Sequence, residues 1–160
     1  MFERFGEFNN AEEINETAVN LRKEGDWESL EVLAKENGIE ADVLEIFMRG
    51  GILYLCDDMT AAIGKIEVEE KEVKCAEIME DWVEYIKAQC FEKPEVARAV
   101  RKKGKSLAGC IAALLQWSFK NQVPVDKGIM KAAGVSAGRC TLGIPGMARA
   151  KRIITDYYLK

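Results

Sequence analysis

The chain has 160 residues, of which 48% are apolar and 31% charged, so it is long enough for one domain or two small lobes and is not a disordered chain. It contains no histidine, which excludes Ser-His-Asp and Cys-His nucleophiles and HExxH zinc sites. The net charge of −4 conceals an asymmetry, because residues 1–80 carry a net charge of −13 and residues 81–160 a net charge of +9.

The first half of the chain shows the apolar periodicity of helices, interrupted by capping residues and glycines. Asn10 and Asp26 are suited to cap the first two helices, and a glycine pair at 50–51 closes the third. The helices predicted in this half cover residues 11–24, 27–36, 40–49 and 52–63. The charged stretch that follows gives one weak signal for a strand, at 66–68.

In the second half, Pro94 stands where a first-turn proline belongs, and Ser106 is suited to cap the next helix. That helix is apolar almost all round, which is typical of a buried central helix. The predicted helices of this half cover residues 76–91, 94–103, 107–120, a short segment between 125 and 134, and the end of the chain around 150–158. The predicted fold class is therefore all-α, a compact bundle of seven to nine short helices around the buried helix 107–120.

The charge asymmetry suggests a division of this bundle into an acidic helical lobe, residues 1–74, and a basic helical lobe, residues 75–160, that contains the central helix. The two lobes could also form one continuous domain, with their opposite charges neutralising each other across an internal interface. Asymmetry of this kind otherwise indicates an electrostatic partner.

The five cysteines form an odd, widely spaced set without a CxxC pair, which is typical of reduced thiols packed on buried helix faces. No metal site and no cofactor are therefore expected. The missing histidine does not exclude carboxylate or lysine chemistry, but neither has a signature in this sequence. We predict no catalytic residues and a protein that is not an enzyme.

No apolar run approaches the roughly 20 residues that cross a bilayer. The acidic start of the chain resembles neither a signal peptide nor a transit peptide. We therefore expect the protein to stay in the compartment where it is made, without a membrane partner.

Three short motifs suggest a function, and each has a plainer interpretation. Residues 104–106 resemble the end of a phosphate-binding loop, but that loop requires glycine where this chain has Ala99. The acidic pair at 57–58 does not converge as a catalytic dyad must, because adjacent helical residues point roughly 100° apart, so we interpret it as solvated charge. Residues 129–136 resemble the first helix and turn of a helix-turn-helix, but glycines and a proline between 138 and 145 would break the recognition helix that should follow.

Clustered charges supply the candidate binding residues. The basic candidates form one cluster before Ser106 and a second on the last helix: Arg98, Arg101, Lys102, Lys103 and Lys105, then Arg149, Lys151 and Arg152. Clustered lysines and arginines gain from counterion release on phosphates, so both clusters are candidates for nucleic-acid contact. The alternative is a solvated face that pairs with the acidic half. The acidic candidates, on the exposed face of the first helix, are Glu12, Glu13 and Glu16, which suit contact with a basic protein channel.

Four stretches together carry a resemblance: FGEFNNAEEIN, LYLCDDMTAAIGK, EDWVEYIKAQCFEKPEVARAVRKKGKSLAGCI and GIPGMARAKRIITDYYL. They resemble small proteins carried on phages and conjugative elements of gut Firmicutes, a group that includes anti-CRISPR inhibitors of type II CRISPR effector nucleases. The C-terminal half also resembles PcfK-like proteins of conjugative plasmids through its KP…GKSLAGCI…DYY arrangement. The resemblance implies a protein of the bacterial cytoplasm that has no catalytic residues and binds the guide-RNA-loaded nuclease.

Two functions follow as hypotheses. The first is stoichiometric inhibition of an RNA-guided type II CRISPR nuclease, impairing its binding or cleavage of target DNA. The alternative is a DNA-binding accessory or regulatory protein of a conjugative element or phage, which would use the basic half and the segment that resembles a helix-turn-helix. A third hypothesis, an enzyme without histidine, is supported by no motif.

Overall fold

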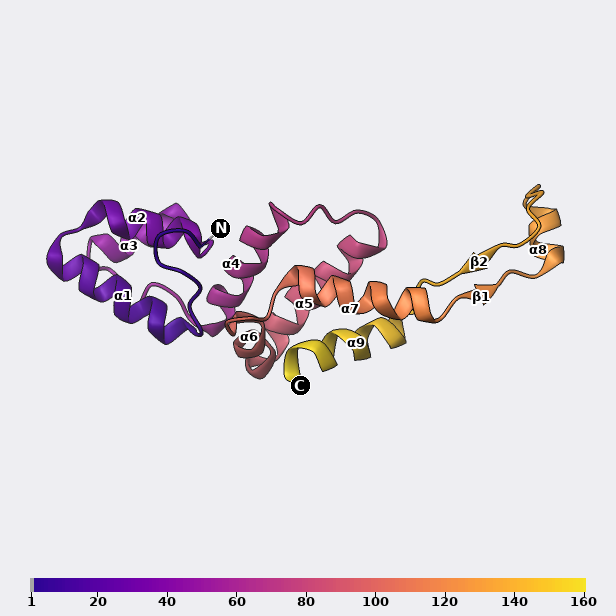
Figure 1. Cartoon of the computed structure of the whole chain (residues 1–160). Helices are drawn as coiled ribbons and strands as arrows, with labels where there is room; N and C mark the ends of the chain where they lie inside the picture. Colours follow the sequence, from indigo (N-terminus) through magenta and orange to yellow (C-terminus); the bar gives the residue numbers. More distant parts are fainter. Residues whose placement is uncertain (1) are drawn as a thin grey trace.

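The computed structural model describes residues 2–160, which form nine helices and one two-stranded antiparallel sheet (Figure 1). In chain order the elements are α1 (Ala11–Glu24), α2 (Trp27–Glu36), α3 (Ala41–Met48), α4 (Asp58–Glu70), α5 (Ile78–Glu92), α6 (Pro94–Arg101), α7 (Leu107–Lys120), β1 (Val123–Pro124), α8 (Lys127–Ala132), β2 (Thr141–Leu142) and α9 (Met147–Leu159). The all-α fold class is confirmed, and the helices found in this range fit the expected seven to nine.

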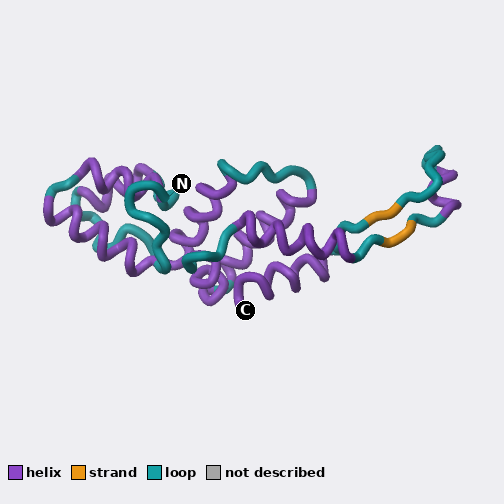
Figure 2. Tube along the Cα trace, in the orientation of Figure 1, coloured by secondary structure: helices purple, strands orange, loops and turns teal. Residues whose placement is uncertain are grey.

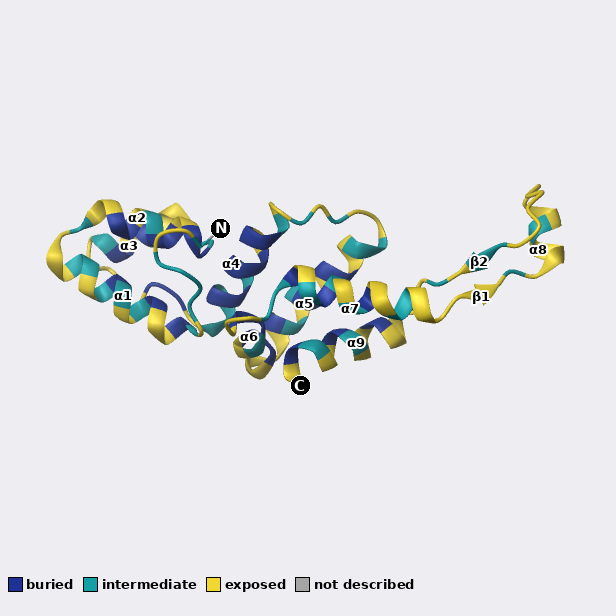
Figure 3. Ribbon diagram, in the orientation of Figure 1, coloured by how far each residue is buried: buried dark blue, intermediate teal, exposed yellow. Residues whose placement is uncertain are grey.

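The elements are arranged along one long axis (Figure 1). The helices α1, α2 and α3 form one end, and α4 to α7 together with α9 form the middle. Residues 121–144 project from the other end; we call this projection, which carries β1, α8 and β2, the arm (Figure 2). Buried residues are concentrated in the helical regions, whereas none of the arm's residues is buried (Figure 3). The arm therefore has no core of its own.

Local signals in the sequence explain most of the helix ends. The side chains of Asn10, Asp26 and Ser106 each accept a hydrogen bond from the backbone N–H group three residues later, so these predicted caps are confirmed. Gly25 closes α1 with a φ of 71°, in the left-handed region that favours glycine. Pro94 occupies the first turn of α6, as expected.

The fourth helix begins and ends later than predicted. It was expected over residues 52–63, but α4 starts only after Asp57, whose side chain accepts a hydrogen bond from the backbone N–H of Thr60 at 2.7 Å. The strand signalled at 66–68 is wrong, because these residues continue α4. The apolar and charged stretches of the sequence therefore belong to one helix, which carries buried charges in its second half.

The expectation of a centrally buried α7 holds for only part of that helix. Leu107, Cys110 and Leu114 are buried, but Leu115 is 52% and Phe119 74% exposed. One apolar face of α7 packs into the core, and a second apolar face is exposed to solvent. The central helix is α4, which has more buried residues than any other described helix and packs against α5, α6 and α7.

The buried apolar side chains form two clusters, which meet inside α4. One cluster unites α1, α2 and α3 with Ala61 of α4. The other unites α5, α6, α7 and α9 with Ala62 and Ile66 of α4. The division into two lobes, 1–74 and 75–160, stays a prediction. The boundary between the two apolar clusters lies within α4, between Ala61 and Ala62, and not in the charged stretch after that helix.

Gly64 brings the two clusters into backbone contact. It lies against the turn that closes α2, and a Cβ on Gly64 would lie 2.1 Å from the carbonyl oxygen of Asn37. The opposing Gly38 has a φ of 66° and an equally close approach to Gly64. Glycine on both sides is therefore required for α2 and α4 to meet at this distance.

A buried ionic cluster crosses the same junction. Nζ of the fully buried Lys65 lies 2.5 Å from Oε1 of Glu7 and 3.9 Å from Oε1 of Glu69, and it donates to the carbonyl oxygen of Lys102 at 3.1 Å. Glu69 also accepts a hydrogen bond from the backbone N–H of Leu107 at 2.6 Å. Desolvation lowers the pKa of Lys65 and raises the pKa of Glu69. The cluster ties the N-terminal segment and the α6–α7 turn to α4.

Candidate partner-binding surfaces

The structure removes Arg101 from the predicted phosphate-binding cluster. The side chain is 1% exposed, and its Nη2 donates to Oδ1 of Asn37 at 2.8 Å. Desolvation lowers the pKa of this guanidinium. The prediction of nucleic-acid contact by Arg101 is wrong, because a side chain buried in this way cannot reach a phosphate. Its position one turn after the buried Ala97 on α6 was the signal available in the sequence.

Lys105 is also held by the fold. Its Nζ donates to the carbonyl oxygen of Tyr157 at 2.6 Å and lies 5.1 Å from the centre of the Tyr157 ring. The backbone carbonyl of Lys105 in turn accepts a hydrogen bond from the buried Lys65. The ammonium of Lys105 therefore fastens α9 to the α6–α7 turn, which leaves it poorly placed for a partner.

The remaining residues of the first basic cluster lie at the surface. Arg98 forms an ion pair with Asp58, with 3.2 Å between Nη1 and Oδ2. Lys102 and Lys103 are exposed, and their side chains form no ion pair within residues 2–160. The predicted cluster of five cations is thus reduced to two free lysines and one paired arginine.

The second basic set lies on α9, and its three members are exposed as predicted. The guanidinium of Arg149 lies 5.8 Å from the ring centre of Trp117 on α7, and the ammonium of Lys151 lies 5.2 Å from that of Tyr85 on α5. Residues two apart point to different sides of a helix. Lys151 therefore faces away from Arg149, so the three cations do not share one side of α9.

The segment that resembles a helix-turn-helix does not form one. α8 covers Lys127–Ala132, and Gly134 closes it with a φ of 67°. The next described element is β2, at Thr141–Leu142, so no recognition helix follows. No helix forms between α8 and β2, as expected from the glycines in this segment.

The acidic candidates on α1 are all exposed, as predicted. Glu13 is partly engaged within the fold, because its Oε2 accepts a hydrogen bond from the backbone N–H of Asn9, the residue before the helix cap, at 2.7 Å. Glu12 and Glu16 have no ionic partner in the described part of the chain. Both line a large hollow of the surface, where they lie near residues that were not predicted as candidates.

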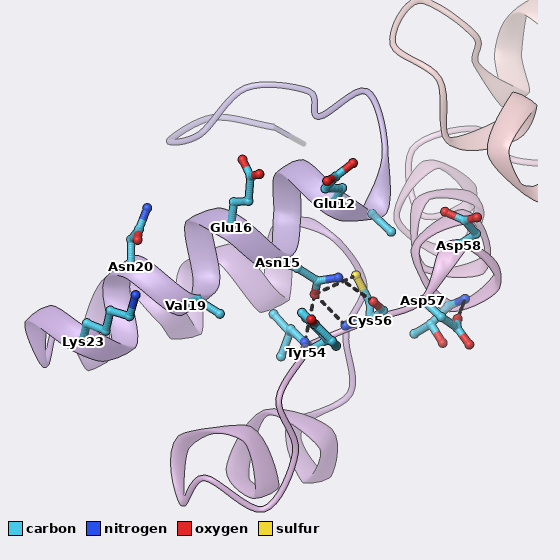
Figure 4. A pocket seen from close by; sticks show the side chains of 13 residues that line it. Glu12, Asn15, Glu16, Val19, Asn20, Lys23, Tyr54, Cys56, Asp57 and Asp58 are labelled. Atoms are coloured by element: carbon cyan, nitrogen blue, oxygen red, sulfur yellow. Dashed lines mark hydrogen bonds between the residues drawn. The ribbon is translucent and has the colours of Figure 1, made fainter.

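This hollow is an open groove of about 1140 Å³ between α1 and the segment that leads into α4 (Figure 4). We call it the acidic groove. Its lining residues are Ala11, Glu12, Asn15, Glu16, Val19, Asn20, Lys23, Tyr54, Leu55, Cys56, Asp57, Asp58 and Thr60. Four carboxylates and a single ammonium therefore surround it, so it suits a cationic segment of a partner.

One side chain fixes the shape of the acidic groove. Oδ1 of Asn15 accepts hydrogen bonds from the backbone N–H groups of Leu55 and Cys56 at 2.8 and 3.0 Å, and its Nδ2 donates to the carbonyl oxygen of Cys56 at 2.7 Å. Burial raises the pKa of the Cys56 thiol to about 12, so this cysteine is not a nucleophile at neutral pH. The groove is pre-formed, and its chemistry is electrostatic.

The part of this groove that comes from the segment before α4 was not predicted from the sequence. Asp57 and Asp58 were interpreted as solvated charge, and they do lie at the surface, with Asp57 capping α4 and Asp58 paired to Arg98. Their proximity to Glu12 and Glu16 depends on a contact between segments 40 residues apart in the chain. The only local signal was Asn15, a polar residue next to the buried face of α1.

A second hollow, of about 350 Å³, lies between α5, α7 and the base of the arm. We call it the apolar groove. It is lined by Ile78, Met79, Trp82, Ile111, Leu115, Ser118, Phe119, Gln122, Gly143 and Ile144. The indole Nε1 of Trp82 is buried and has no hydrogen-bond acceptor among the described residues. Exposed apolar side chains beside an unsatisfied donor are typical of a surface that a partner covers.

In the described part of the chain, no group of three or more His, Cys, Asp or Glu side chains is placed to hold a metal ion. None of the described helices is long and apolar enough to cross a bilayer. The chain matches no protein-family model, no curated protein and no solved structure.

Proposed function

We propose that the protein is a stoichiometric inhibitor of a guide-RNA-loaded type II CRISPR nuclease, which it binds through the acidic groove and the adjoining face of α1. The observation that carries the proposal is the excess of carboxylates around the groove, two of which, Glu12 and Glu16, are unpaired within the described chain. An RNA-guided nuclease holds nucleic acid in positively charged channels and reads its short adjacent motif with arginines. The sequence resemblance to anti-CRISPR inhibitors supports the same partner.

The proposed mechanism is occupation of cations that target DNA needs. Carboxylates that pair with the lysines and arginines of a nuclease channel compete with the phosphates of DNA for the same positive groups. Because Asn15 holds the groove in shape before binding, little ordering cost opposes association. Opposite fields would also speed the encounter between the acidic surface and the nuclease. No covalent chemistry is required, so inhibition follows the ratio of the two proteins.

The test is a plasmid-cleavage assay in which the purified protein is titrated against a guide-loaded type II nuclease. Inhibition should saturate near one molecule per nuclease. The groove variant Glu12→Lys/Glu16→Lys should need at least about tenfold more protein, mainly because association slows. The control variant Glu31→Lys/Glu92→Lys makes the same change in net charge at two exposed positions outside the groove. It should inhibit like the unmodified protein.

Two results would contradict this proposal. If both variants are folded by circular dichroism and inhibit like the unmodified protein, the groove is not the contact surface. If the unmodified protein does not bind or inhibit guide-loaded type II nucleases at micromolar concentrations, the function itself is wrong.

One observation favours the alternative, a DNA-binding accessory or regulatory protein. Lys102, Lys103 and Arg152 are exposed cations without an ionic partner among residues 2–160. In a gel shift with plain duplex DNA, this alternative predicts binding that weakens steeply with salt. Lys102→Glu/Lys103→Glu should weaken it further and reduce the salt dependence, because each lost phosphate contact removes about one released counterion. Cleavage inhibition without any shift of duplex DNA would reject the alternative.

A further inference from the structure

The arm has few contacts of its own to stabilise its extended hairpin structure. Its two strands have two residues each, and beyond them Val125 donates one backbone hydrogen bond to the carbonyl of Cys140, at 2.9 Å. None of the arm's residues is buried, yet it carries large apolar side chains that are 46–63% exposed: Val123, Ile129, Val135, Leu142 and Ile144. A two-stranded hairpin is at best marginally stable in water. The arm therefore carries apolar surface that nothing in the described chain covers.

The charges of the arm indicate the sign of the surface that covers it. Lys127, Lys131 and Arg139 are exposed and form no ion pair within the described chain. Asp126, the arm's one acidic residue, caps α8 by accepting a hydrogen bond from the backbone N–H of Gly128 at 2.7 Å. The arm is thus basic and apolar, and an acidic surface with apolar parts is complementary to it.

The same chain carries such a surface at its other end. The acidic groove lies on α1, whereas the arm projects from the opposite end of the long axis (Figure 1). Within and beside the groove, Tyr54 and Leu53 are large apolar side chains exposed to solvent. The apolar groove, formed by α5, α7 and the base of the arm, lies between the two ends.

We propose that the occupant of the acidic groove is the arm of a second copy of this chain, in an antiparallel homodimer. In this arrangement each arm lies in the acidic groove of the other copy, and both contacts form at once because the molecule carries the groove and the arm at opposite ends. The two apolar grooves then face each other near the two-fold axis. The contacts close on themselves, as in most homodimers, so the pair does not grow into a filament.

The composition of this interface fits a stable dimer. Leu115 and Phe119 would supply an apolar centre, and the arm cations and groove carboxylates a charged periphery, which is the usual anatomy of an interface. The five exposed apolar side chains of the arm together with Leu115 and Phe119 would bury roughly 100 Å² each, or about 700 Å² per copy, close to the ~800 Å² of a standard interface. A nucleic acid would pair with the cations and leave this apolar area exposed to solvent.

This dimer goes beyond the proposed function, because both partners of the contact belong to the chain itself. It also has a consequence for that function. The arm of a second copy and a nuclease would compete for the same groove, so dimerisation would reduce the fraction of protein that is free to bind.

Sedimentation of the purified full chain, without nuclease or nucleic acid, tests the proposal. We expect a dimer that dissociates on dilution and more readily at high salt. Phe119→Ser should raise the dissociation constant of the dimer at least about tenfold. Because the Phe119 side chain is mostly exposed, the variant should have the circular dichroism spectrum of the unmodified protein. Lys127→Glu/Lys131→Glu in the arm and Glu12→Lys/Glu16→Lys in the groove should each weaken it by a similar factor.

A charge exchange separates the specific contact from a general effect of charge. Mixing the arm variant with the groove variant should restore a dimer, because each acidic arm then meets a basic groove and each basic arm meets an acidic groove. A single chain that carries all four substitutions should dimerise by itself for the same reason. A monomer at all concentrations would overturn the proposal and assign the arm to another partner. So would a dimer that the reversals do not weaken, or one that the mixture does not restore.

Discussion

Nη2 of Arg101 lies 2.8 Å from Oδ1 of Asn37, and this hydrogen bond joins the end of α6 to the residue that closes α2. The bond crosses the junction of the two apolar clusters, beside the half-buried Glu7 and the buried Glu69, whose carboxylates interact favourably with the guanidinium. Arg101 therefore acts in the fold, while its neighbour Lys102 is exposed to solvent.

This difference gives opposite expectations for two adjacent residues. Arg101→Glu should lower the free energy of unfolding by at least about 3–5 kcal/mol, because it places a third carboxylate in the buried cluster that holds Glu7 and Glu69. Lys102→Glu should change it by no more than about 0.5 kcal/mol, as surface substitutions do. Urea denaturation followed by circular dichroism measures both. Equal midpoints for the two variants would contradict the buried role of Arg101.

The contact between Gly64 and the turn at 37–38 predicts a steric effect. Gly64→Ala should destabilise the protein by about 1–3 kcal/mol or more, because the added methyl group would lie 2.1 Å from a backbone oxygen that cannot move independently. Gly138→Ala is the matched control, because the structure has no atom within 4 Å of a Cβ there and the φ of Gly138 is not positive. Thermal unfolding should separate the two variants, and equal melting temperatures would mean that the two clusters do not meet this closely.

The helices could be predicted from the sequence because their signals are local. Caps such as Asn10 and Ser106 make hydrogen bonds to residues three positions away, so spacing alone reveals them. The start of α4 was missed because hydrogen bonds to the side chain of Asn15 hold Leu55 and Cys56 in an irregular conformation. Asn15 lies 40 residues before Leu55 in the chain. Periodicity within the apolar run could not reveal that contact.

The candidate surfaces were predictable only in part, for a similar reason. Glu12 and Glu16 are exposed because they lie opposite the apolar stripe of α1, and a helical pattern shows this. The pattern also counted Arg101 as exposed, since it treats every cation as solvated. Leu115 and Phe119 are exposed although they were expected in the core, because the sequence does not distinguish an exposed apolar side chain from a buried one.

Two adjacent leucines of α7 provide a direct measure of this difference. Leu114→Ala should cost about 2–5 kcal/mol, the range for truncating a buried leucine, because Leu114 is fully buried. Leu115→Ala should cost less than about 1 kcal/mol in a monomer, since half of this side chain is already in contact with water. Chemical denaturation at low protein concentration gives both values. Similar losses for the two variants would show that α7 is buried on both faces after all.

The buried cluster around Lys65 predicts a specific dependence on pH. Desolvation raises the pKa of Glu69 above its ordinary value of 4.5, so the folded chain binds this proton more tightly than the unfolded chain. The contribution of Glu69 to stability is therefore lowest at neutral pH and rises as the pH falls through the raised pKa toward 4.5. Because glutamine does not titrate, stability relative to the Glu69→Gln variant should shift in favour of the unmodified protein between pH 7 and about pH 4.

Urea denaturation of both proteins at the two pH values measures the difference between their free energies of unfolding. Groups distant from Glu69 titrate alike in both proteins, so their contributions cancel in this difference. A difference that moves in the opposite direction would mean that attraction to Lys65 outweighs desolvation and holds the pKa of Glu69 below 4.5.

The cysteines should fall into two classes of reactivity. Burial raises the pKa values of Cys56, Cys90 and Cys110 to about 12, so at neutral pH these thiols carry almost no thiolate and are shielded from reagents. Cys75 and Cys140 are only half-buried. A chromogenic disulfide reagent should therefore titrate at most two thiols rapidly in the folded protein and all five in denaturant, and Cys75→Ser/Cys140→Ser should abolish the rapid phase. If that double variant still reacted rapidly, at least one of the three buried cysteines would be accessible, and the apolar clusters that contain them would open far more readily than their packing implies.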